Sequence, residues 1–349
     1  NEEIALLACA ATKSMSVKEA LALPGEESKK VQDAIDAELS VLIGEMGALE
    51  EVLEGDESTL GQRMFHLGCG VVKKEADSLK PARIKARCWL QGNEEVYGVD
   101  YVECTSPVHR LCAFNLVCCV AAVEKDWIFE HSDQTAAFCH VKDAKKVLAR
   151  MPKELRKYKI VDGVQREVLY WVGNLYGRHD AGRKYVKMHR QWFFDRGFTC
   201  TTAEPCLFRR VDEKGECLVS VYVDDVAWLF SNETVASELR EEYKKTFRAE
   251  FGPCTSFLGV TVERDCKHGL VHTHQTAKIV ALAEKWLPAD CPLRRSPPDR
   301  PCDEKLASLV SPAAQKTYEP CPAKLKLAYQ SLIGALLYLA LCTRGDCAY

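Results

Sequence analysis

Three aspartates are the residues of this sequence whose types and spacing could support catalysis. Asp133 lies at the end of a short strand predicted from the apolar run Trp127–Phe129, and Asp224 and Asp225 separate two β-forming runs, VSVYV and VAWLF. Carboxylate oxygens are the ligands that Mg²⁺ prefers, and paired divalent ions can activate a hydroxyl nucleophile and stabilise a departing pyrophosphate. An Asp pair is also common in turns for purely structural reasons, so spacing alone leaves that alternative open.

The elements around these aspartates predict an antiparallel sheet that brings them together. Helices are expected at 181–196 and 233–247, and strands at 127–133, 206–210, 217–223, 226–230 and 257–262. We interpret this order as an α+β fold with a β-α-β-β-α-β antiparallel sheet, in which helices cover one face. The hairpin at 217–230 would turn at Asp224-Asp225. Asp133 would then lie beside that turn.

The N-terminal part of the chain is acidic. Residues 1–60 contain 4 Lys, no Arg and 14 Asp or Glu, and the remainder has a net charge of +7. A mildly basic body is compatible with binding a phosphate backbone, although charge alone favours a solvated acidic helix beside a near-neutral domain. Apolar spacing predicts a helix over 30–48, with Val31, Ile35, Leu39, Leu42 and Ile43 on its buried side. A loop is expected over 54–62, and a second helix from Ser106-Pro107 to Val123.

Composition excludes several classes of protein. Hydrophobic residues make up 47% and charged residues 28%, as in soluble globular proteins, and no apolar run approaches the roughly 20 residues of a membrane span. We therefore expect no membrane partner. The 18 cysteines contain no C-x-x-C pair and no secretion signal is visible, which predicts a reducing intracellular compartment. His272 and His274 would share one face of a strand, but the sequence offers no nearby partner ligand, so we interpret them as structural.

A collinear series of motifs resembles the reverse transcriptases of copia-type retrotransposons. Its centre is YVDD at 222–225, which resembles the catalytic box of that family. The other matching segments are KARCWLQGNEEVYGVDYVECTSPV (85–108), SDQTAAFCH (132–140), NLYGRHDAGRKY (174–185), GFTCTTAEPCLF (197–208), FLGVTV (257–262) and YQSLIGALLYLALCTRGD (329–346). Agreement in order and spacing makes this resemblance far more specific than any single box.

The resemblance implies a right-hand polymerase with fingers, palm and thumb. It implies Mg²⁺, with Mn²⁺ as a substitute, deoxynucleoside triphosphates, and an RNA or DNA template annealed to a primer. We expect an acidic, partly helical leader at 1–58, fingers and palm at 59–270, and a truncated thumb and connection at 271–349. The chain would be part of a Pol polyprotein whose integrase and ribonuclease H regions lie outside it, in a cytoplasmic particle or the nucleus.

The family's functional residues can be carried over onto matching positions. Asp133 and Asp224 would be the principal metal ligands, with Asp225 completing the acidic cluster, and Tyr222 would lie by the primer end. The remaining positions would contact the nucleotide: Lys85 and Arg87 at the triphosphate, Phe138 as an aromatic gate against a 2′-hydroxyl, and Asp180. Phe138 could instead be a core aromatic, and Lys85 and Arg87 could belong to a solvated basic strand.

Some positions depart from the family pattern. Asp180 replaces a Gln, Gly182 a Pro, and Tyr185 a Trp. Repulsion between the Asp180 carboxylate and a triphosphate could cost on the order of 1–4 kcal/mol. The sequence therefore leaves three hypotheses: an active polymerase, a decayed copy that binds nucleic acid without turnover, or an unrelated α+β scaffold.

Overall fold

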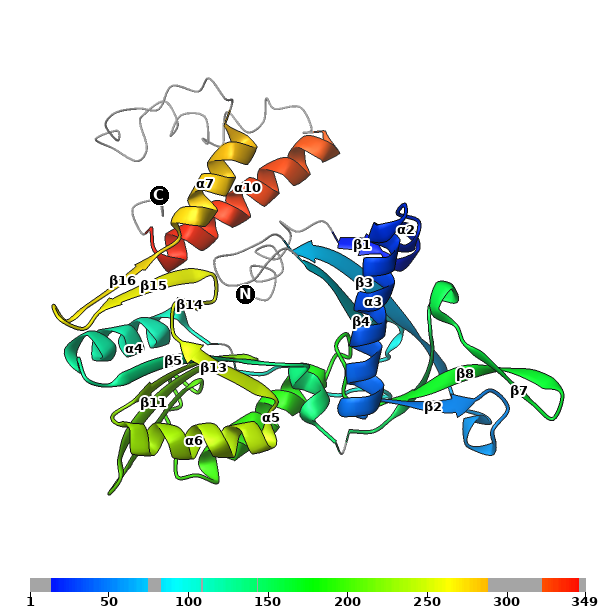
Figure 1. Ribbon diagram of the computed structural model, residues 1–349, viewed down its shortest axis with the longest axis horizontal. Coiled ribbons are helices and arrows are strands. Elements are labelled where there is room, and N and C mark those ends of the chain that lie inside the picture. The colour runs from blue at the N-terminus through cyan, green and yellow to red at the C-terminus, as the bar shows by residue number, and fades with distance from the viewer. Residues whose placement is uncertain (1–13, 75–82, 108, 143, 288–321, 345–349) are drawn as a thin grey trace. The chain divides into compact units, whose positions relative to one another are not determined.

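The computed structural model describes residues 14–74, 83–107, 109–142, 144–287 and 322–344 (Figure 1). The chain divides into two compact units, Thr12–Cys254 and a second made of Thr255–Tyr349 with Asn1–Ala11. The boundaries expected after residues 58 and 270 do not coincide with this division. Among the described residues, the first unit holds two large sheets, and the second holds a small sheet and two helices, which gives a mixed fold with several sheets.

A six-stranded antiparallel sheet carries all three aspartates. Its strand order is β13-β5-β12-β11-β10-β9. The bounds are β5 Ile128–Gln134, β9 Thr199–Cys200, β10 Leu207–Asp212, β11 Gly215–Tyr222, β12 Asp225–Phe230 and β13 Ala249–Pro253. Helices α5 (Ala181–Phe194) and α6 (Glu233–Thr246) lie on one face, and α4 (Leu111–Val123) lies on the other (Figure 1). Helices thus cover both faces, whereas the sequence predicted them on one.

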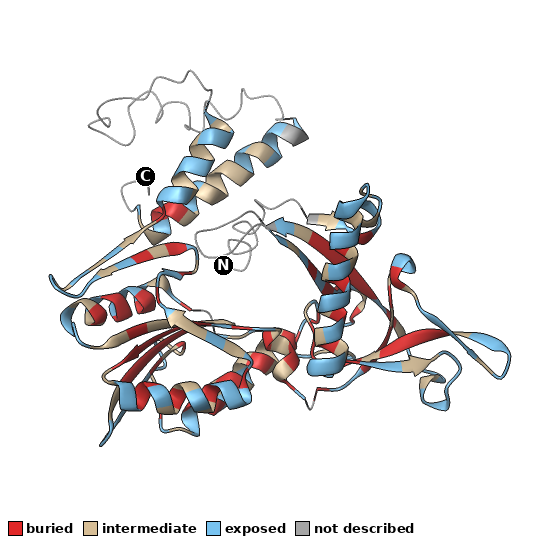
Figure 2. Ribbon diagram, viewed as in Figure 1, coloured by how far each residue is buried: buried red, intermediate tan, exposed pale blue. Residues whose placement is uncertain are grey.

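Aromatic and aliphatic side chains fill the space between this sheet and α5 and α6. Trp228 and Phe230 of β12 are fully buried and stack at 5.6 Å, and Phe193 and Tyr243 of the two helices pack against Trp228. Figure 2 shows the buried residues along the strands and on the sides of α4 and α6 that face them. Burying side chains of this size stabilises a fold by roughly 1.5–3 kcal/mol each, which makes this sheet a rigid platform.

The last strand of this sheet was predicted in the wrong place. The strand that follows α6 and pairs with β5 is β13, not residues 257–262. Gly252 and Pro253 make its sequence, AEFGP, a poor strand by composition, but an edge strand tolerates Pro at its end. Residues 257–262 instead turn at Leu258-Gly259, both at positive φ, between two strands of the small sheet.

The seven-stranded sheet includes two strands from the region expected to be an acidic leader. Its order is β1-β3-β6-β8-β2, with β4 on β3 and β7 on β8. The bounds are β1 Ser14–Ser16, β2 Leu49–Leu53, β3 Met64–Lys74, β4 Arg83–Leu90, β6 Val147–Arg150, β7 Tyr158–Val161 and β8 Val164–Val172. Strands β1 and β2 pair with β3 and β8, so the acidic segment is built into this sheet rather than set apart from it.

The helices of this part differ in their limits from the predicted ones. Helices α2 (Val17–Leu21) and α3 (Glu26–Ser40) precede a π-helical turn at Val41–Glu45, so the helix expected over 30–48 starts and ends earlier. Val31, Ile35 and Leu39 are buried as predicted. Helix α4 begins at Leu111 rather than at Ser106-Pro107, which lie outside it. The loop at 54–62 is confirmed, with one 3₁₀ turn at Glu57–Thr59.

In the part of the second unit that the structure describes, a three-stranded sheet is joined to two helices. Its elements are β14 (Ser256–Phe257), β15 (Val260–Asp265), β16 (Leu270–His274), α7 (Thr276–Trp286) and α10 (Ala323–Cys342). The Tyr338 hydroxyl of α10 donates to the Leu258 carbonyl, and the Thr343 hydroxyl donates to Gln275 Oε1 at 3.0 Å.

One helix of the second unit is long and apolar. By length and composition alone, the segment Leu325–Cys342 of α10 could cross a membrane. This segment was not recognised in the sequence as a long apolar run, because Lys326 and Gln330 interrupt it. A single such helix does not distinguish a span from a packed helix of a soluble protein, and the expectation of no membrane partner stays a prediction.

Candidate active site

The structure brings Asp133 and Asp225 side by side. Asp133 of β5 is the direct partner of Asp225 in β12, which in turn pairs with Tyr222 of β11. Directly opposed residues of antiparallel strands point to the same face, with Cα atoms about 4.5–5.5 Å apart. Asp133, Asp225 and Tyr222 therefore form one row across three strands. Asp133 is exposed and the other two are half-buried, so the row is accessible to solvent.

Asp224 lies at the tip of the hairpin next to this row. The pair Tyr222–Asp225 closes the ladder, so the two turn residues are Val223 and Asp224, one position earlier than predicted. Val223 has φ +54°, a conformation that glycine adopts easily and a β-branched residue rarely does. Such a residue stores roughly 1–3 kcal/mol of strain, which the surrounding packing must hold.

A closed ring of buried hydrogen bonds between β5, α5 and α6 supports the turn. Tyr185 donates to Gln134 Oε1 at 2.8 Å, Gln134 Nε2 donates to the Tyr243 oxygen, Tyr243 donates to His189 Nε2 at 2.8 Å, and His189 Nδ1 lies 3.2 Å from the Tyr185 oxygen. Burial lowers the pKa of His189 to about 3, so its imidazole is neutral and has one donor and one acceptor nitrogen. The Tyr185 hydroxyl has one proton, which it can donate to the Val223 carbonyl oxygen at 3.2 Å instead of to Gln134. The network thus links β5, α5 and α6 to the strained turn.

The electrostatics of Asp224 show a concentrated negative charge. Burial, together with the neighbouring carboxylates of Asp225 and Asp133, raises the pKa of this carboxyl to about 6, while Arg87 opposes the rise. Among the described residues, the three aspartates are not one of the groups whose ligand atoms all lie within 4.8 Å of one another. Carboxylate oxygens are the ligands that divalent cations such as Mg²⁺ prefer, so a divalent cation is a suitable counter-charge for these aspartates.

The raised pKa of Asp224 predicts that its charge destabilises the fold. The folded-state pKa of about 6 lies above the ordinary 3.8, so the protonated Asp224 carboxyl makes its full contribution to the free energy of unfolding below about pH 4. That contribution is lost as the pH rises through about 6 and the carboxyl ionises. The full difference is roughly 3 kcal/mol. We expect Asp224→Asn to unfold like wild type at about pH 4 and to be up to ~3 kcal/mol more stable at about pH 8, in urea titrations without divalent metal.

The control for this pH dependence is Asp195→Asn, which removes an exposed carboxylate just beyond α5. We expect this variant to follow wild type at every pH. A stabilisation by Asp224→Asn that is the same at low and high pH would contradict the assigned cause.

Arg87 and three aromatic rings line one side of Asp224. The Arg87 guanidinium lies 5.2 Å from the centre of the Tyr176 ring, and the Phe138 ring lies 4.9 Å from Tyr176 and 5.8 Å from Tyr185. Burial is the main cause that raises the pKa of Tyr176. Asp224 raises this pKa as well, whereas Arg87 lowers it. The cation, the ring and the carboxylate are therefore close enough to interact. Phe138 is half-buried, so it both packs on the core and presents part of its ring.

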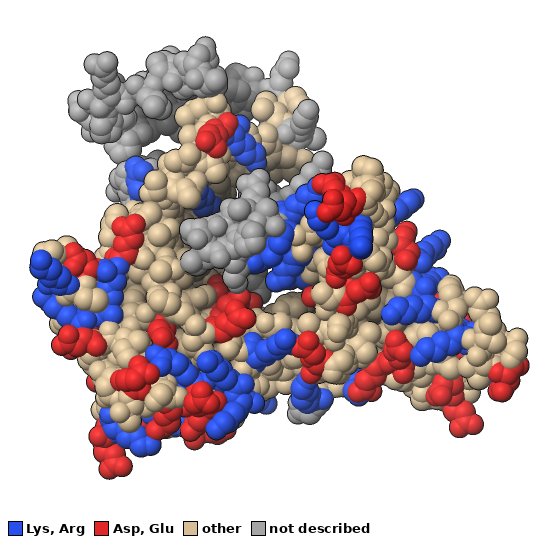
Figure 3. Space-filling model, viewed as in Figure 1, with Lys and Arg blue, Asp and Glu red and all other residues tan. Residues whose placement is uncertain are grey.

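Lys85 and Arg87 lie on β4, where the burial pattern alternates. Both are exposed, while Ala86 and Cys88 are buried. Basic side chains gather over the β3–β4 end of the first unit (Figure 3). Glu38 of α3 accepts a hydrogen bond from the Cys88 backbone N–H at 3.3 Å. Burial raises the pKa of Glu38, and Lys85 and Arg87 oppose that rise, so this carboxylate belongs to the same charged group.

Asp180 is paired inside the protein. Its carboxylate lies 2.6 Å from Lys184 Nζ and 3.7 Å from Arg178 Nε, and the residue is buried. The sequence predicted a negative charge that would face the nucleotide. Two cations instead offset that charge at the N-terminus of α5, which weakens the expected repulsion.

Tyr222 packs against His109, which no sequence motif singled out. The two rings meet edge to face at 6.1 Å, and His109 Nε2 lies 2.6 Å from the Ser220 hydroxyl. Burial lowers the pKa of His109 to about 4, so this ring is neutral near pH 7. This ring contact lies at the Tyr222 end of the row.

Sequence reasoning missed two further residues of the site. Glu250 of β13 is the direct partner of Asp133 and extends the carboxylate row on its other side. His131, two residues before Asp133 on the same face, has Nε2 3.2 Å from Asp225 Oδ1. The signal for Glu250 was hidden because its strand was not recognised. His131 could have been found from strand alternation alone.

The arrangement of these side chains indicates a class of protein. Carboxylates at a strand end and an adjacent hairpin turn, with a basic strand and aromatic rings nearby, are the parts of a metal-dependent phosphoryl-transfer site. The chain belongs to the reverse transcriptase (RNA-dependent DNA polymerase) family, whose model matches residues 66–287.

Two relatives place this domain within Pol polyproteins. The chain is 25% identical over 342 residues to the retrovirus-related Pol polyprotein from transposon TNT 1-94 of Nicotiana tabacum, which covers 96% of this chain and 24% of the relative. It is 27% identical over 275 residues to that from transposon RE1 of Arabidopsis thaliana, covering 76% of this chain and 17% of the relative. The resemblance to copia-type reverse transcriptases is confirmed. The chain spans about a quarter or less of these relatives.

Proposed function

We propose that this chain is an RNA-directed DNA polymerase that adds deoxynucleotides to a primer 3′-end with Mg²⁺ as cofactor and Mn²⁺ as a substitute. The observation that carries the proposal is the register that pairs Asp133 with Asp225 and leaves Asp224 on the adjoining turn. The carboxylates lie at one end of neighbouring strands, where they could hold a divalent metal ion together. The family supports a nucleic-acid template and nucleotide substrates.

In this proposal Asp133 and Asp224 are the principal metal ligands. Magnesium held there would neutralise phosphate charge and activate the primer hydroxyl. Asp225 contacts His131, so its carboxylate is oriented by the protein and completes the acidic cluster. Tyr222 would lie by the primer end at the edge of the same row.

The nucleotide would bind between the aspartates and β4. Lys85 and Arg87 would contact triphosphate oxygens as charge-assisted donors. Phe138 would face the sugar and exclude a 2′-hydroxyl, and its contacts with Tyr176 and Tyr185 would hold the ring in place.

The domain names follow from these roles. The six-stranded sheet would be the palm, the seven-stranded sheet with α3 the fingers, and the second unit the thumb. The template would be RNA or DNA annealed to a primer, and the integrase and ribonuclease H activities would belong to other regions of a Pol polyprotein.

Primer extension tests the proposal directly. The chain, a homopolymer RNA template with an annealed DNA primer, and the complementary deoxynucleotide are mixed with Mg²⁺ or Mn²⁺, and product length is followed on a gel. Metal-dependent extension supports the polymerase. Tight binding of the primer–template without extension under either metal would support the decayed copy instead.

Asp180→Gln, which restores the family's residue, is expected to change the KM for the nucleotide by less than about twofold. Lys184 and Arg178 already offset the carboxylate, so little repulsion is left to remove. Lys184→Gln is the matched variant. It removes the cation that pairs with Asp180, so the uncompensated carboxylate should raise the KM for the nucleotide. Steady-state extension at varied nucleotide concentration measures both. A tenfold fall in KM for Asp180→Gln would show that the charge does face the triphosphate.

A further inference from the structure

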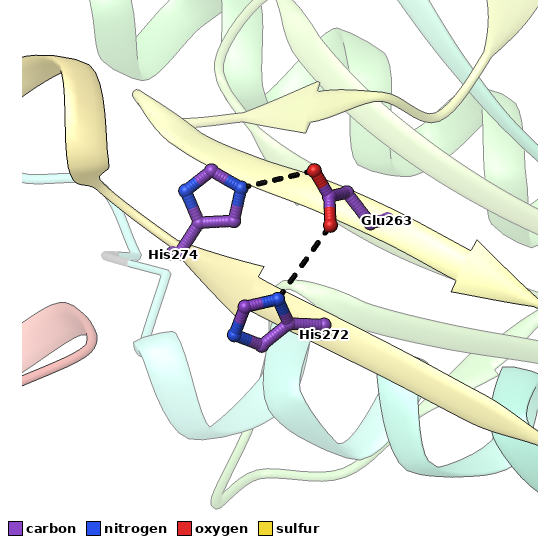
Figure 4. A group of neighbouring side chains, drawn as sticks. All are labelled: Glu263, His272 and His274. Atoms are coloured by element: carbon purple, nitrogen blue, oxygen red, sulfur yellow. Dashed lines mark hydrogen bonds and ion pairs between the residues drawn. The ribbon is translucent and has the colours of Figure 1, made fainter.

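Three possible metal ligands meet on the β15–β16 hairpin, in the unit that lacks the aspartates. Glu263 lies between His272 and His274, and its two carboxylate oxygens face one imidazole each (Figure 4). His274 Nε2 is 3.3 Å from Glu263 Oε1, and His272 Nδ1 is 3.6 Å from Glu263 Oε2. Within the part of the chain that the structure describes, this is the group of three whose ligand atoms all lie within 4.8 Å of one another.

The register of the hairpin explains why these side chains converge. Glu263 pairs directly with His272, and Thr261 pairs with His274. Residues two apart on a strand share a face, and directly opposed residues share it as well. His272, His274 and Glu263 therefore stand on one face of a two-stranded ladder. The H-x-H motif alone looked structural because its third ligand lies on the other strand and is nine residues away in sequence.

The spacing suits a small transition-metal ion. A tetrahedral Zn²⁺ with ligands at about 2.0–2.1 Å places its ligand atoms about 3.3 Å apart, close to the two carboxylate–imidazole separations. Two imidazoles and a carboxylate favour Zn²⁺ and its neighbours over Mg²⁺, which selects oxygen ligands. The chemistry of this group is thus distinct from that of the three aspartates.

A neighbouring hydroxyl can fix the tautomer that metal binding needs. The Thr276 Oγ1 atom lies 2.9 Å from His274 Nδ1, so the imidazole can donate its Nδ1 proton there and keep Nε2 for the ion. Metal-bound histidines commonly use such an outer hydrogen bond. The Thr276 backbone N–H also faces Nδ1, at 3.4 Å, a longer contact that the protonated tautomer would give up. Since Thr276 is the first residue of α7, the ion would tie the hairpin to that helix.

We propose that Glu263, His272 and His274 form a binding site for a divalent transition-metal ion of the zinc class, which clips β15 to β16 where the chain enters α7. His272 and Glu263 have side chains 70% and 65% exposed, so an ion can enter without unfolding the hairpin. The open face leaves the remaining coordination position to water. The site does not depend on the polymerase proposal, since it uses none of the same residues.

The test is a Zn²⁺ titration of the whole chain against a chromophoric chelator, after exposed thiols have been alkylated and with excess Mg²⁺ present. We expect His272→Ala, His274→Ala and Glu263→Gln each to lose one bound ion or at least about tenfold in affinity, since even outer-sphere partners contribute 10–100-fold. His268→Ala is the matched control, because His268 is an exposed histidine of the same hairpin that contacts Asp265 instead. It should bind Zn²⁺ like wild type.

Chemical modification gives a second readout that does not count ions. Zn²⁺ should protect His272 and His274 from acylation by diethyl pyrocarbonate, read residue by residue by mass spectrometry, and leave His268 reactive. Circular dichroism establishes that each variant is folded. Equal Zn²⁺ binding by wild type and all three ligand variants, or no protection of the two histidines, would overturn the proposal.

Discussion

Asp224→Asn is expected to lower the rate of primer extension by about 10³-fold, because removing a metal ligand forfeits roughly 4 kcal/mol of transition-state stabilisation. Asparagine has the same shape and keeps the turn, but its amide carries no charge to hold a divalent ion. Single-nucleotide extension under single-turnover conditions measures the chemical step. Binding of the primer–template, measured by fluorescence anisotropy, should be retained or improved, since a negative charge has been removed from the site.

The variants of the neighbouring carboxylates sharpen this expectation. Asp133→Asn should be as severe as Asp224→Asn, whereas Glu250→Gln should be milder because Glu250 lies beyond Asp133 from the hairpin turn. Asp195→Asn is the control for the loss of an exposed carboxylate elsewhere in the first unit. Extension by Asp224→Asn within tenfold of wild type would rule out the assigned role, whatever the other variants do.

The central hairpin was accessible from the sequence because its signals are local. VSVYV and VAWLF are rich in β-branched and aromatic residues, and their alternation gives the right strands. The turn was misplaced by one residue since Asp-Asp is a better turn by composition than Val-Asp. Val223 has a positive φ in a turn that is closed by the pairing of Tyr222 with Asp225, and its carbonyl oxygen lies 3.2 Å from the Tyr185 hydroxyl, so contacts outside the turn hold it.

Contacts that depend on register across distant segments could not be predicted from the sequence. Glu250 meets Asp133 only because β13, a poor strand by composition, adds to the edge of β5. Likewise, Glu263 meets His272 only in the paired hairpin. The acidic N-terminal segment was interpreted as a leader from its charge, but buried apolar residues such as Val31 and Leu49 join it to the core. The charged residues of an element lie on its exposed side, whereas the apolar residues on its other side determine how it packs.

Asp180 shows how a departure from a family pattern can be compensated. Beside it, the Arg178 side chain is 1% exposed and its Nε lies 3.4 Å from Glu95 Oε1, while its Nη1 donates to the carbonyl oxygens of Lys145 and Gly173. Glu95, whose side chain is fully buried, also accepts from the His179 backbone N–H at 2.8 Å. One guanidinium therefore lies within ion-pair distance of two buried carboxylates at the start of α5, and Lys184 supplies the second cation.

Arg178→Met is accordingly expected to destabilise the fold by about 3–5 kcal/mol, because it keeps the length of the side chain but leaves Glu95 and Asp180 without their shared buried cation. Urea unfolding followed by tryptophan fluorescence measures the loss. The matched control is Arg183→Met, since Arg183 forms an exposed ion pair with Glu103, and it should change stability by less than about 1 kcal/mol. The double variant Arg178→Met/Glu95→Gln should regain part of the loss, because removing the stranded charge relieves its desolvation. Equal effects of the two single arginine variants would show that the buried network does not stabilise this fold.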